Sequence, residues 1–219
     1  MTCIGLLSDT HGDVEAAQEA LRLLEQGRAE QIIHCGDVGL SVLKMLPAGR
    51  THVVAGNTDE LETASRVAAC AGLVWHGRFG RLRIGETRIA FLHGDDRRAM
   101  RDAIHGGEFD LVFCGHTHSA EDVVVGGVRV INPGAVVRSS SPSVAIVEIP
   151  DTSNERDHEE EFAEKQGAGV WQSADRADVR FLFLREHALS PEQLSHQREL
   201  ITRHLVPTAL LQLGILNRN

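Results

Sequence analysis

The sequence lacks any apolar run of about 20 residues, the length that a membrane-spanning helix needs. It also lacks a basic leader, because the apolar run Cys3–Leu7 begins almost at once. These absences argue against an integral membrane protein and a secreted one. We expect a cytoplasmic protein with no membrane partner, built as one well-packed domain with an appendage.

Cysteine is scarce, and the four cysteines lack the Cys-x-x-Cys spacing that is typical of zinc and redox sites. Cys3, Cys35 and Cys114 lie in apolar runs, and Cys70 lies near the end of an expected helix. We expect buried, reduced thiols and no catalytic cysteine.

Basic residues are also in deficit, with 22 Lys and Arg against 31 Asp and Glu, for a formal net charge of -9 at pH 7. The chain has no basic stripe of the kind that follows a nucleic-acid backbone. We therefore expect no duplex nucleic acid as a partner.

What the sequence does contain is a repeated pattern of apolar runs that end in polar, metal-type side chains. The runs are residues 3–7, 31–35, 51–55, 88–92 and 111–114. Such runs are typical of strands buried on both faces, and sites in open α/β sheets form outside the carboxyl ends of the strands. The polar side chains that follow the runs are Asp9, His11, Asp37, Asn57, His93, His116 and His118. We expect all seven to converge at one edge.

The mixture of carboxylate, carboxamide and imidazole groups favours divalent metals of intermediate hardness, such as Mn, Fe, Co, Ni or Zn. Calcium prefers a shell of oxygen atoms alone, and a single tetrahedral zinc needs fewer ligands. Two ions that share one carboxylate would use the whole set. Any one of the histidines, taken alone, is better explained as a packed or surface residue, so the prediction depends on the set.

In these segments the sequence resembles the calcineurin-like metallophosphoesterases, and within them the small bacterial and archaeal phosphodiesterases. The matching blocks, in the family's order, are Asp9-Thr10-His11, Gly36-Asp37, Gly56-Asn57-Thr58-Asp59, His93-Gly94, Gly115-His116-Thr117-His118 and Asn132-Pro133-Gly134. The resemblance implies an α/β fold in which a two-sheet β-sandwich is flanked by helices.

The resemblance also implies a binuclear metal-dependent hydrolase, in which a metal-bridging hydroxide attacks a phosphodiester or a similar small phosphate ester. It places Asp9, His11 and His118 at the first ion, Asp37 between both ions, and Asn57, His93 and His116 at the second. We expect two manganese ions, with Fe, Ni, Co or Zn as alternatives. Asp37, Asn57 and His93 are expected to be catalytic, and Asn57 and Arg138 to contact the substrate.

Thr58 departs from the pattern of many phosphomonoesterases and protein phosphatases of this group, which carry a histidine directly after the asparagine. General-acid assistance of about 10² to 10⁴-fold is therefore missing at this position. This favours diesters or esters with a good leaving group. A phosphomonoesterase, a dinucleoside polyphosphate hydrolase and a catalytically silent scaffold, such as a retromer subunit that resembles this superfamily, are the alternatives.

Four further residues near or between the motifs can be explained by a structural role as well as by a role in the site. Asp59 either orients a metal ligand or caps the helix that follows. His34 either supports a ligand or packs within its strand. His52 and His76 lie in no motif, and we expect no part for them in the site.

Hydrophobic spacing and turn residues predict the remaining elements. Helices are expected at 13–26, 41–46, 59–70 and 95–105, and further strands at 82–84, 123–125, 128–131 and 144–149. Gly126-Gly127 is a hairpin signal. Because the late strands follow one another closely, we expect the second sheet to be largely antiparallel.

The last third of the chain carries fewer signals. The metallophosphoesterase domain is expected to span residues 1–186, with a charged loop insert at about 151–177. Residues 178–185 alternate like a strand and are expected to pair with 144–149. Residues 187–219 are expected to form a helical extension that starts at Ser190-Pro191. This extension either docks on the domain or joins two subunits into a homo-oligomer.

Overall fold

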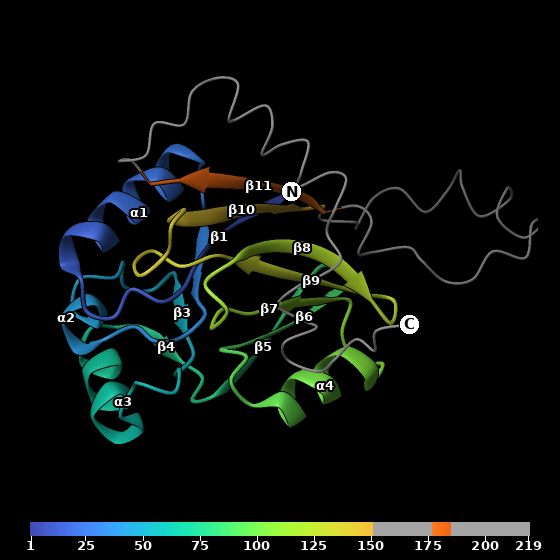
Figure 1. Cartoon of the computed structure of the whole chain (residues 1–219), viewed down its shortest axis with the longest axis horizontal. Helices are drawn as coiled ribbons and strands as arrows, with labels where there is room; N and C mark the ends of the chain where they lie inside the picture. The colour runs from blue at the N-terminus through green and yellow to red at the C-terminus, as the bar shows by residue number, and fades with distance from the viewer. Residues whose placement is uncertain (151–176, 185–219) are drawn as a thin grey trace, which may run out of the picture.

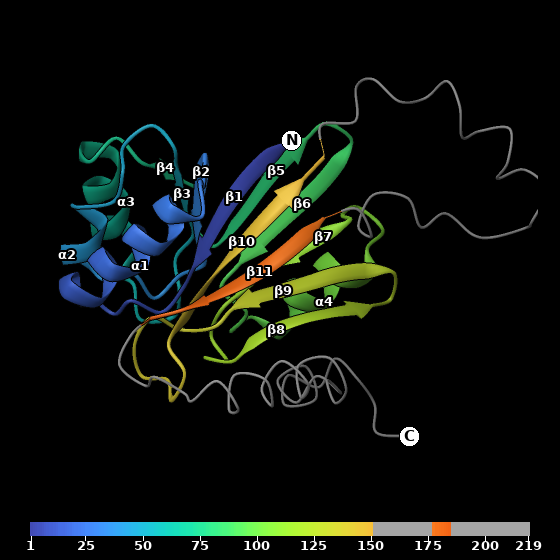
Figure 2. The same ribbon diagram turned by 90° about the horizontal axis from the view of Figure 1, so that it is seen from above.

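The computed structural model of the chain describes residues 1–150 and 177–184. These residues form two stacked sheets with helices on both outer faces (Figures 1 and 2). The predicted helix at 187–219 and all but the last residue of the predicted insert at 151–177 lie outside the described residues. No helix of the described part has the length and apolar character to cross a membrane.

The first sheet has six strands, of which β1 to β4 run parallel. Their order is β11 (Asp178–Phe183), β10 (Ser143–Ile149), β1 (Thr2–Leu7), β2 (Gln31–His34), β3 (Thr51–Val53) and β4 (Val74–Trp75). β10 pairs antiparallel with β1 and with β11, in a register that sets Ser143 opposite Phe183. The predicted pairing of the strand at 178–185 with the strand at 144–149 is therefore confirmed.

The second sheet has five strands. Their order is β5 (Phe79–Ile84), β6 (Thr87–Leu92), β7 (Leu111–Phe113), β9 (Val128–Pro133) and β8 (Ala120–Val125). The predicted hairpin is confirmed, since Val125 pairs with Val128 across Gly126-Gly127. The prediction of a largely antiparallel sheet is wrong, because β6, β7 and β9 run parallel and only β5 and β8 run against their neighbours.

Three hydrophobic clusters hold the layers together. The helices are α1 (Val14–Gln26), α2 (Leu40–Leu43), α3 (Leu61–Cys70) and α4 (Arg97–His105). Figure 1 shows α1 to α3 on the side of the first sheet and α4 on the side of the second. In β1, Leu6 packs between the two sheets, whereas Leu7 packs under the helices that cover the first sheet. In β6, Phe91 packs between the two sheets, whereas Leu92 packs against α4. Burial on both faces explains the continuous apolar runs.

The four cysteines are free thiols, as predicted. Cys35 and Cys114 are buried and Cys3 is half-buried, but Cys70 is exposed. The prediction of burial is wrong for Cys70 because α3 turns Ala64 and Ala68 toward the core and leaves this position on its outer face.

Candidate metal centre

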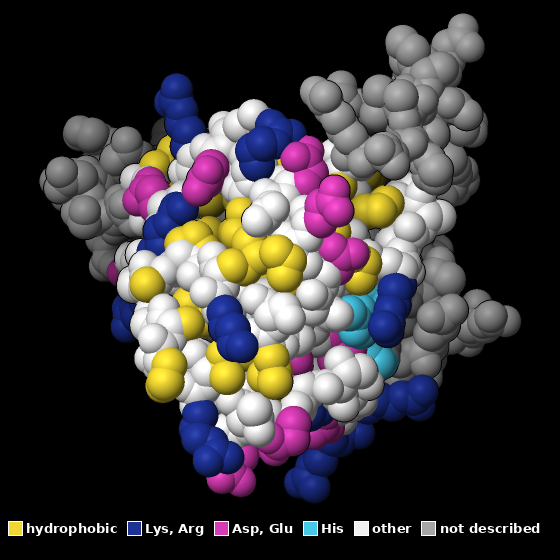
Figure 3. All heavy atoms as spheres, turned by 90° about the vertical axis from the view of Figure 1, so that its left-hand side faces the viewer, with side chains coloured by type: hydrophobic (Ala, Val, Ile, Leu, Met, Phe, Trp, Pro, Cys, Tyr) yellow, Lys and Arg dark blue, Asp and Glu magenta, His cyan; other side chains and the backbone are white. Residues whose placement is uncertain are grey.

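Backbone hydrogen bonds join the loops that carry the predicted ligands. In the loops that follow the first sheet, the amide of His11 donates to the carbonyl oxygen of Asp37 at 2.8 Å. In the loops that follow the second sheet, the amide of Gly115 donates to the carbonyl oxygen of His93 at 2.9 Å. His93 links the sheets, because its Nδ1 lies 2.8 Å from the carbonyl oxygen of Cys35. The loops thus meet at one edge, where Figure 3 shows histidine side chains next to acidic and basic ones.

Asp9, His11 and His118 form one group whose ligand atoms all lie within 4.8 Å of one another. His118 Nε2 is 3.2 Å from Asp9 Oδ1, and His11 Nε2 is 3.9 Å from the same oxygen. The group contains the three residues that the resemblance places at the first ion.

Asp9, Asp37 and His93 form a second such group. The two oxygens of Asp37 face different histidines: Oδ1 lies 3.5 Å from Nε2 of His93, and Oδ2 lies 3.7 Å from Nε2 of His11. Asp37 is therefore oriented toward both groups. Asp9 is shared as well, since its Oδ1 lies 4.0 Å from His93 Nε2.

The other two predicted ligands lie beside these groups. The ring of His116 is 5.0 Å from that of His93 between centroids, and its amide donates to Asp9 Oδ2 at 3.2 Å. Asn57 is exposed, but the next residue, Thr58, donates its amide to Asp37 Oδ1 at 2.9 Å. The structure thus brings five predicted ligands into direct proximity, with His116 alongside and Asn57 at the rim.

Two of the rings have one nitrogen committed to a backbone carbonyl. His93 Nδ1 meets Cys35 O at 2.8 Å, and His118 Nδ1 meets Arg138 O at 3.1 Å. Because a carbonyl oxygen can only accept, Nδ1 carries the proton in both rings. Nε2 of each ring is thereby left to face the carboxylates, an arrangement common among metal-binding histidines.

Three buried atoms of the site have no hydrogen-bond partner among the described residues: Asp9 Oδ1, His11 Nε2 and His93 Nε2. Each unpaired polar atom of this kind costs about 1–3 kcal/mol. A divalent cation among them would satisfy all three, and a set of imidazole and carboxylate donors suits such an ion. The residues present therefore fit a metal.

The electrostatics agree with this fit. Burial disfavours ionisation of Asp37, but the imidazole of His93 and the amide of Thr58 hold its pKa well below the usual range. Burial alone would lower the pKa of His93, yet the carboxylates of Asp37 and Asp9 raise it. Burial lowers the pKa of His11 and of His116. The centre therefore holds the ionised carboxylate of Asp37, which attracts positive charge, next to the neutral imidazoles of His11 and His116.

The backbone is left-handed at five of the seven predicted ligands, a conformation uncommon outside glycine. Among non-glycine residues of the described chain, positive φ angles occur at Asp9 (56°), His11 (45°), Asp37 (54°), His116 (70°), His118 (60°), Arg138 (58°) and Arg28 (62°). Each such residue costs about 1–3 kcal/mol unless its surroundings stabilise it. All but Arg28 belong to the site, a concentration that the sequence pattern did not reveal.

Glycines let the loops approach one another closely. A Cβ on Gly56 would lie 2.0 Å from Asp37 Oδ1, and one on Gly115 would lie 1.9 Å from Ser8 Oγ. A Cβ on Gly36 would lie 2.7 Å from His93 Nδ1. The glycines of the motifs are thus required because a Cβ would have no space beside the predicted ligands.

Asp59 supports the ligand loops and is not the helix cap. Its carboxylate accepts hydrogen bonds from the amides of Val38 at 3.1 Å, Gly39 at 3.0 Å and Gly56 at 3.0 Å. The cap of α3 is Glu60, which accepts from two amides of the first turn. Asp59 thereby ties the loop after Asp37 to the loop that carries Asn57.

His34 also supports the site. Its Nε2 lies 2.9 Å from Thr10 Oγ1, and the Thr10 hydroxyl donates to Val38 O at 2.8 Å. The hydroxyl proton is therefore used, so His34 Nε2 is the donor. Complete burial lowers the pKa of His34 to about 4, and the neutral ring fixes the residue between Asp9 and His11.

Sequence reasoning expected no part in the site for His52 and His76, and it did not reveal that the two side chains contact each other at the edge between the sheets. His52 Nδ1 and His76 Nε2 form a hydrogen bond of 2.9 Å, and the His76 ring meets Phe91 edge-on at 4.8 Å. It also missed Arg78, which contacts two ligand loops. Neither feature lies in a motif, so spacing alone could not have found them.

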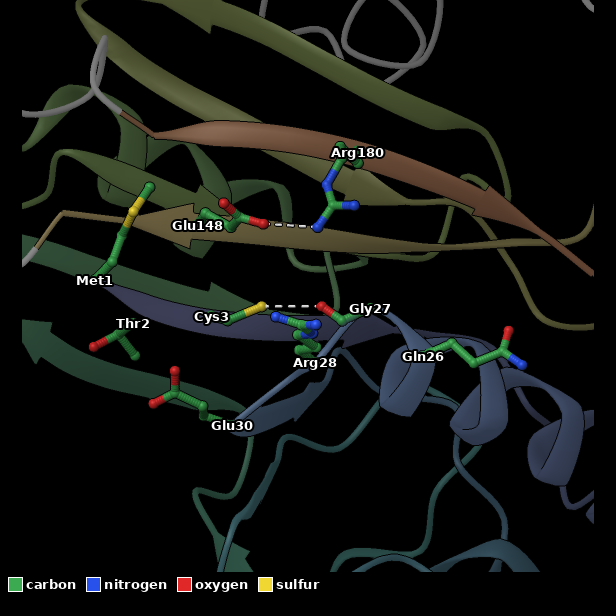
Figure 4. Close-up of a pocket in the computed structure, with 9 residues that line it drawn as sticks. All are labelled: Met1, Thr2, Cys3, Gln26, Gly27, Arg28, Glu30, Glu148 and Arg180. Carbon is green, nitrogen blue, oxygen red and sulfur yellow. Dashed lines mark hydrogen bonds and ion pairs between the residues drawn. The ribbon is translucent and has the colours of Figure 1, made fainter.

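A surface hollow of about 410 Å³ lies at the amino end of β1, the opposite end of the strand from Asp9. Its lining includes Cys3 and the ion pair between Glu148 and Arg180 (Figure 4). None of the seven predicted ligands lines it.

Known proteins share both the sequence pattern and the fold. The family model of the calcineurin-like phosphoesterase superfamily domain matches residues 2–152. A phosphodiesterase from Methanocaldococcus jannaschii is 30% identical over 138 residues, which cover 60% of this chain and 82% of the relative.

Solved structures show the same fold. That of an archaeal phosphodiesterase has a TM-score of 0.64 and 24% identity, covering 84% of this chain and 100% of the other. A single mutant of Vps29 from Entamoeba histolytica has a TM-score of 0.51 and 20% identity, with coverage of 84% and 100%. Because the family model matches more than half of the chain, this protein belongs to the calcineurin-like phosphoesterase superfamily and is a phosphoester hydrolase.

Proposed function

We propose that this protein is a binuclear metal-dependent phosphodiesterase. The observation that carries the proposal is the position of Asp37, whose two oxygens face His11 and His93 in two adjoining groups of ligand-type atoms. One carboxylate placed in this way can serve two ions. The phosphodiesterase from Methanocaldococcus jannaschii supports a diester as the substrate class.

The assignment of ligands combines the first group with what the family resemblance implies for the second ion. We assign Asp9, His11 and His118 to one ion, Asn57, His93 and His116 to the other, and Asp37 to both. Two divalent ions, when bound, supply charge stabilisation to phosphoryl oxygens and acidify a water molecule. Manganese is the metal that we propose, with Fe, Ni, Co and Zn as the alternatives to be compared.

The protein's own groups at the rim support a small phosphate ester. Arg138 is exposed beside the centre, where its carbonyl holds His118 and its charge contributes, after burial, to the lowered pKa of His11. A guanidinium in this place can pair with phosphate oxygens. Thr58 offers no imidazole to protonate a leaving group, which favours diesters and good leaving groups.

The test compares hydrolysis of bis-p-nitrophenyl phosphate and p-nitrophenyl phosphate by protein stripped with EDTA and reloaded with single metals. We expect two bound Mn²⁺ per chain and faster cleavage of the diester. Faster cleavage of the monoester would instead assign a phosphomonoesterase. No bound metal and no activity with any of the ions would make the protein a scaffold and overturn the proposal.

A further inference from the structure

Arg78 lies in the turn between β4 and β5, outside every motif of the sequence. Its Nη1 donates to the carbonyl oxygen of Gly56 at 3.1 Å, and its Nη2 forms an ion pair with the carboxylate of Asp95. The Arg78 side chain is 40% exposed and that of Asp95 is 20% exposed. The guanidinium thus has two fixed partners at the surface.

These two partners belong to different sheets and to different ligand loops. Gly56 follows β3 of the first sheet and directly precedes Asn57. Asp95 follows β6 of the second sheet and stands two residues after His93. No strand pairing joins β3 to β6. One side chain therefore bridges the loops that carry two proposed ligands of the second ion.

The peptide of Gly56 is held from both sides. Its amide donates to Asp59 Oδ2 at 3.0 Å, while its carbonyl oxygen accepts from Arg78. On the far side of Asn57, the Thr58 amide donates to Asp37 Oδ1. Asp59 and Asp37 fix the Asn57 loop within the first sheet, whereas Arg78 fixes it against the second.

We propose that Arg78 is a positioning residue that sets the separation between the Asn57 and His93 loops and so determines the affinity of the second metal ion. The inference rests on the proposed function, because it requires a binuclear centre. Residues that orient metal ligands typically change metal affinity about 10- to 100-fold when replaced. The first ion, whose proposed ligands Arg78 does not hold, should bind as before.

The chain contains a matched control in Arg88, at the amino end of β6, the opposite end from His93. Arg88 forms an ion pair with Asp110 at 2.9 Å and donates to the carbonyl oxygen of Gly107 at 3.2 Å. Its side chain is 48% exposed and that of Asp110 is 19% exposed. Arg88 is thus similar to Arg78 in its exposed fraction, and it likewise contacts one carboxylate and one backbone carbonyl oxygen. Unlike Arg78, it lies away from the centre.

The experiment measures Mn²⁺ binding to the full chain by calorimetry and equilibrium dialysis, for the wild type, Arg78→Gln, Asp95→Asn and Arg88→Gln. We expect two ions in the wild type and in Arg88→Gln. Arg78→Gln and Asp95→Asn should keep one ion and bind the other about 10- to 100-fold more weakly. Turnover of bis-p-nitrophenyl phosphate at limiting Mn²⁺ should fall in both and recover at saturating Mn²⁺ with KM unchanged.

The outcomes separate this inference from the proposed function. If Arg78→Gln binds the second ion as tightly as Arg88→Gln does, the inference is overturned. The proposed binuclear enzyme would still stand. Unchanged metal affinity with a raised KM would also overturn it, because Arg78 would then contact the substrate. If the wild type binds fewer than two ions, the proposed function fails and the inference fails with it. Melting curves in EDTA identify any variant that does not fold.

Discussion

Individual side chains in the centre are oriented by residues outside the predicted ligand set. Asp59 holds three amides of the ligand loops, and His34 holds the hydroxyl of Thr10 between Asp9 and His11. The chemistry of the site therefore depends on residues around the ligands as well as on the ligands themselves.

Replacement of Asp37 by alanine should remove the carboxylate that faces both groups. The variant should lose several kcal/mol of transition-state stabilisation. We therefore expect kcat for bis-p-nitrophenyl phosphate to fall at least about 1000-fold. Metal analysis of the same variant should find fewer than two Mn²⁺ per chain. Turnover close to that of the wild type would refute the binuclear assignment.

Introduction of histidine at Thr58 should restore a proton donor beside the leaving group. We expect Thr58→His to accelerate phenyl phosphate hydrolysis by about 10- to 100-fold, because a poor leaving group needs general-acid assistance. Hydrolysis of p-nitrophenyl phosphate should change much less, and Thr58→Gln should leave both rates as they are. Equal acceleration of both esters by Thr58→His would contradict the role of position 58.

We expect the His34 imidazole to make the free energy of unfolding depend on pH. Its pKa is about 4 in the folded chain against 6.5 as the ordinary value, so between these pH values only the unfolded chain binds the proton. Stability should be complete above pH 6.5 and fall as the pH drops toward 4. His34→Gln keeps a donor for Thr10 but does not titrate.

Urea denaturation in EDTA at pH 7 and pH 5 measures this effect without a contribution from metal release. Between these pH values the wild type should lose about 2 kcal/mol more unfolding free energy than His34→Gln. If the wild type and His34→Gln lose the same amount of unfolding free energy, His34 is already protonated, or freely solvated, in the folded chain.

At the level of elements, the apolar runs predicted nearly every strand because burial on both faces leaves a strong signal. β4 (Val74–Trp75) escaped prediction because two residues carry no periodicity. The pairing of β10 with β11 was predicted, but its pairing with β1 was not, because β9 precedes β10 closely in sequence and β1 lies at the other end of the described chain. The motifs predicted which loops meet, whereas the cross-links through Arg78 and His93 depend on how the two sheets stack.

Among the glycines of the motifs, Gly56 is the one whose added Cβ would lie nearest to an atom of a predicted ligand. Gly56→Ala would place a Cβ 2.0 Å from Asp37 Oδ1, so Asp37 or the Asn57 loop must shift. We expect activity at limiting Mn²⁺ to fall about 100-fold, as for a displaced metal ligand. Gly80→Ala, whose Cβ would lie 2.1 Å from the Phe91 ring, is the control for overpacking elsewhere.

Gly80→Ala should lower the melting temperature, since overpacking costs about 1–3 kcal/mol, without changing the Mn²⁺ affinity of the folded protein. Calorimetric titration of both variants distinguishes the two effects. Equal Mn²⁺ affinity in Gly56→Ala and in the wild type would show that the loop tolerates the extra methyl group.

For the molecule as a whole, the centre lies where the two sheets meet. Asp9, His11 and Asp37 come from the first sheet, and His93, His116 and His118 from the second. Bound metal would cross-link the sheets and favour the folded state. At 100 times the Kd, one site adds about 2.7 kcal/mol to stability, which raises the melting temperature of a domain of this size by about 5–10 °C.

Thermal denaturation with EDTA and with Mn²⁺ tests this linkage. We expect Mn²⁺ to raise the melting temperature of the wild type by this amount and to change that of Asp37→Ala only slightly. An identical melting temperature with and without Mn²⁺ would show that the ligands do not close on an ion in the folded chain.

The left-handed backbone at five of the predicted ligands limits how such a protein can change over evolutionary time. A lineage that abandons hydrolysis no longer needs the carboxylates and imidazoles, but its loops still need residues that accept positive φ. Substitutions at positions 9, 11, 37, 116 and 118 should therefore drift toward glycine and asparagine and avoid valine and isoleucine. Descendants that keep the fold but have lost catalysis would be recognisable by that residue signature alone.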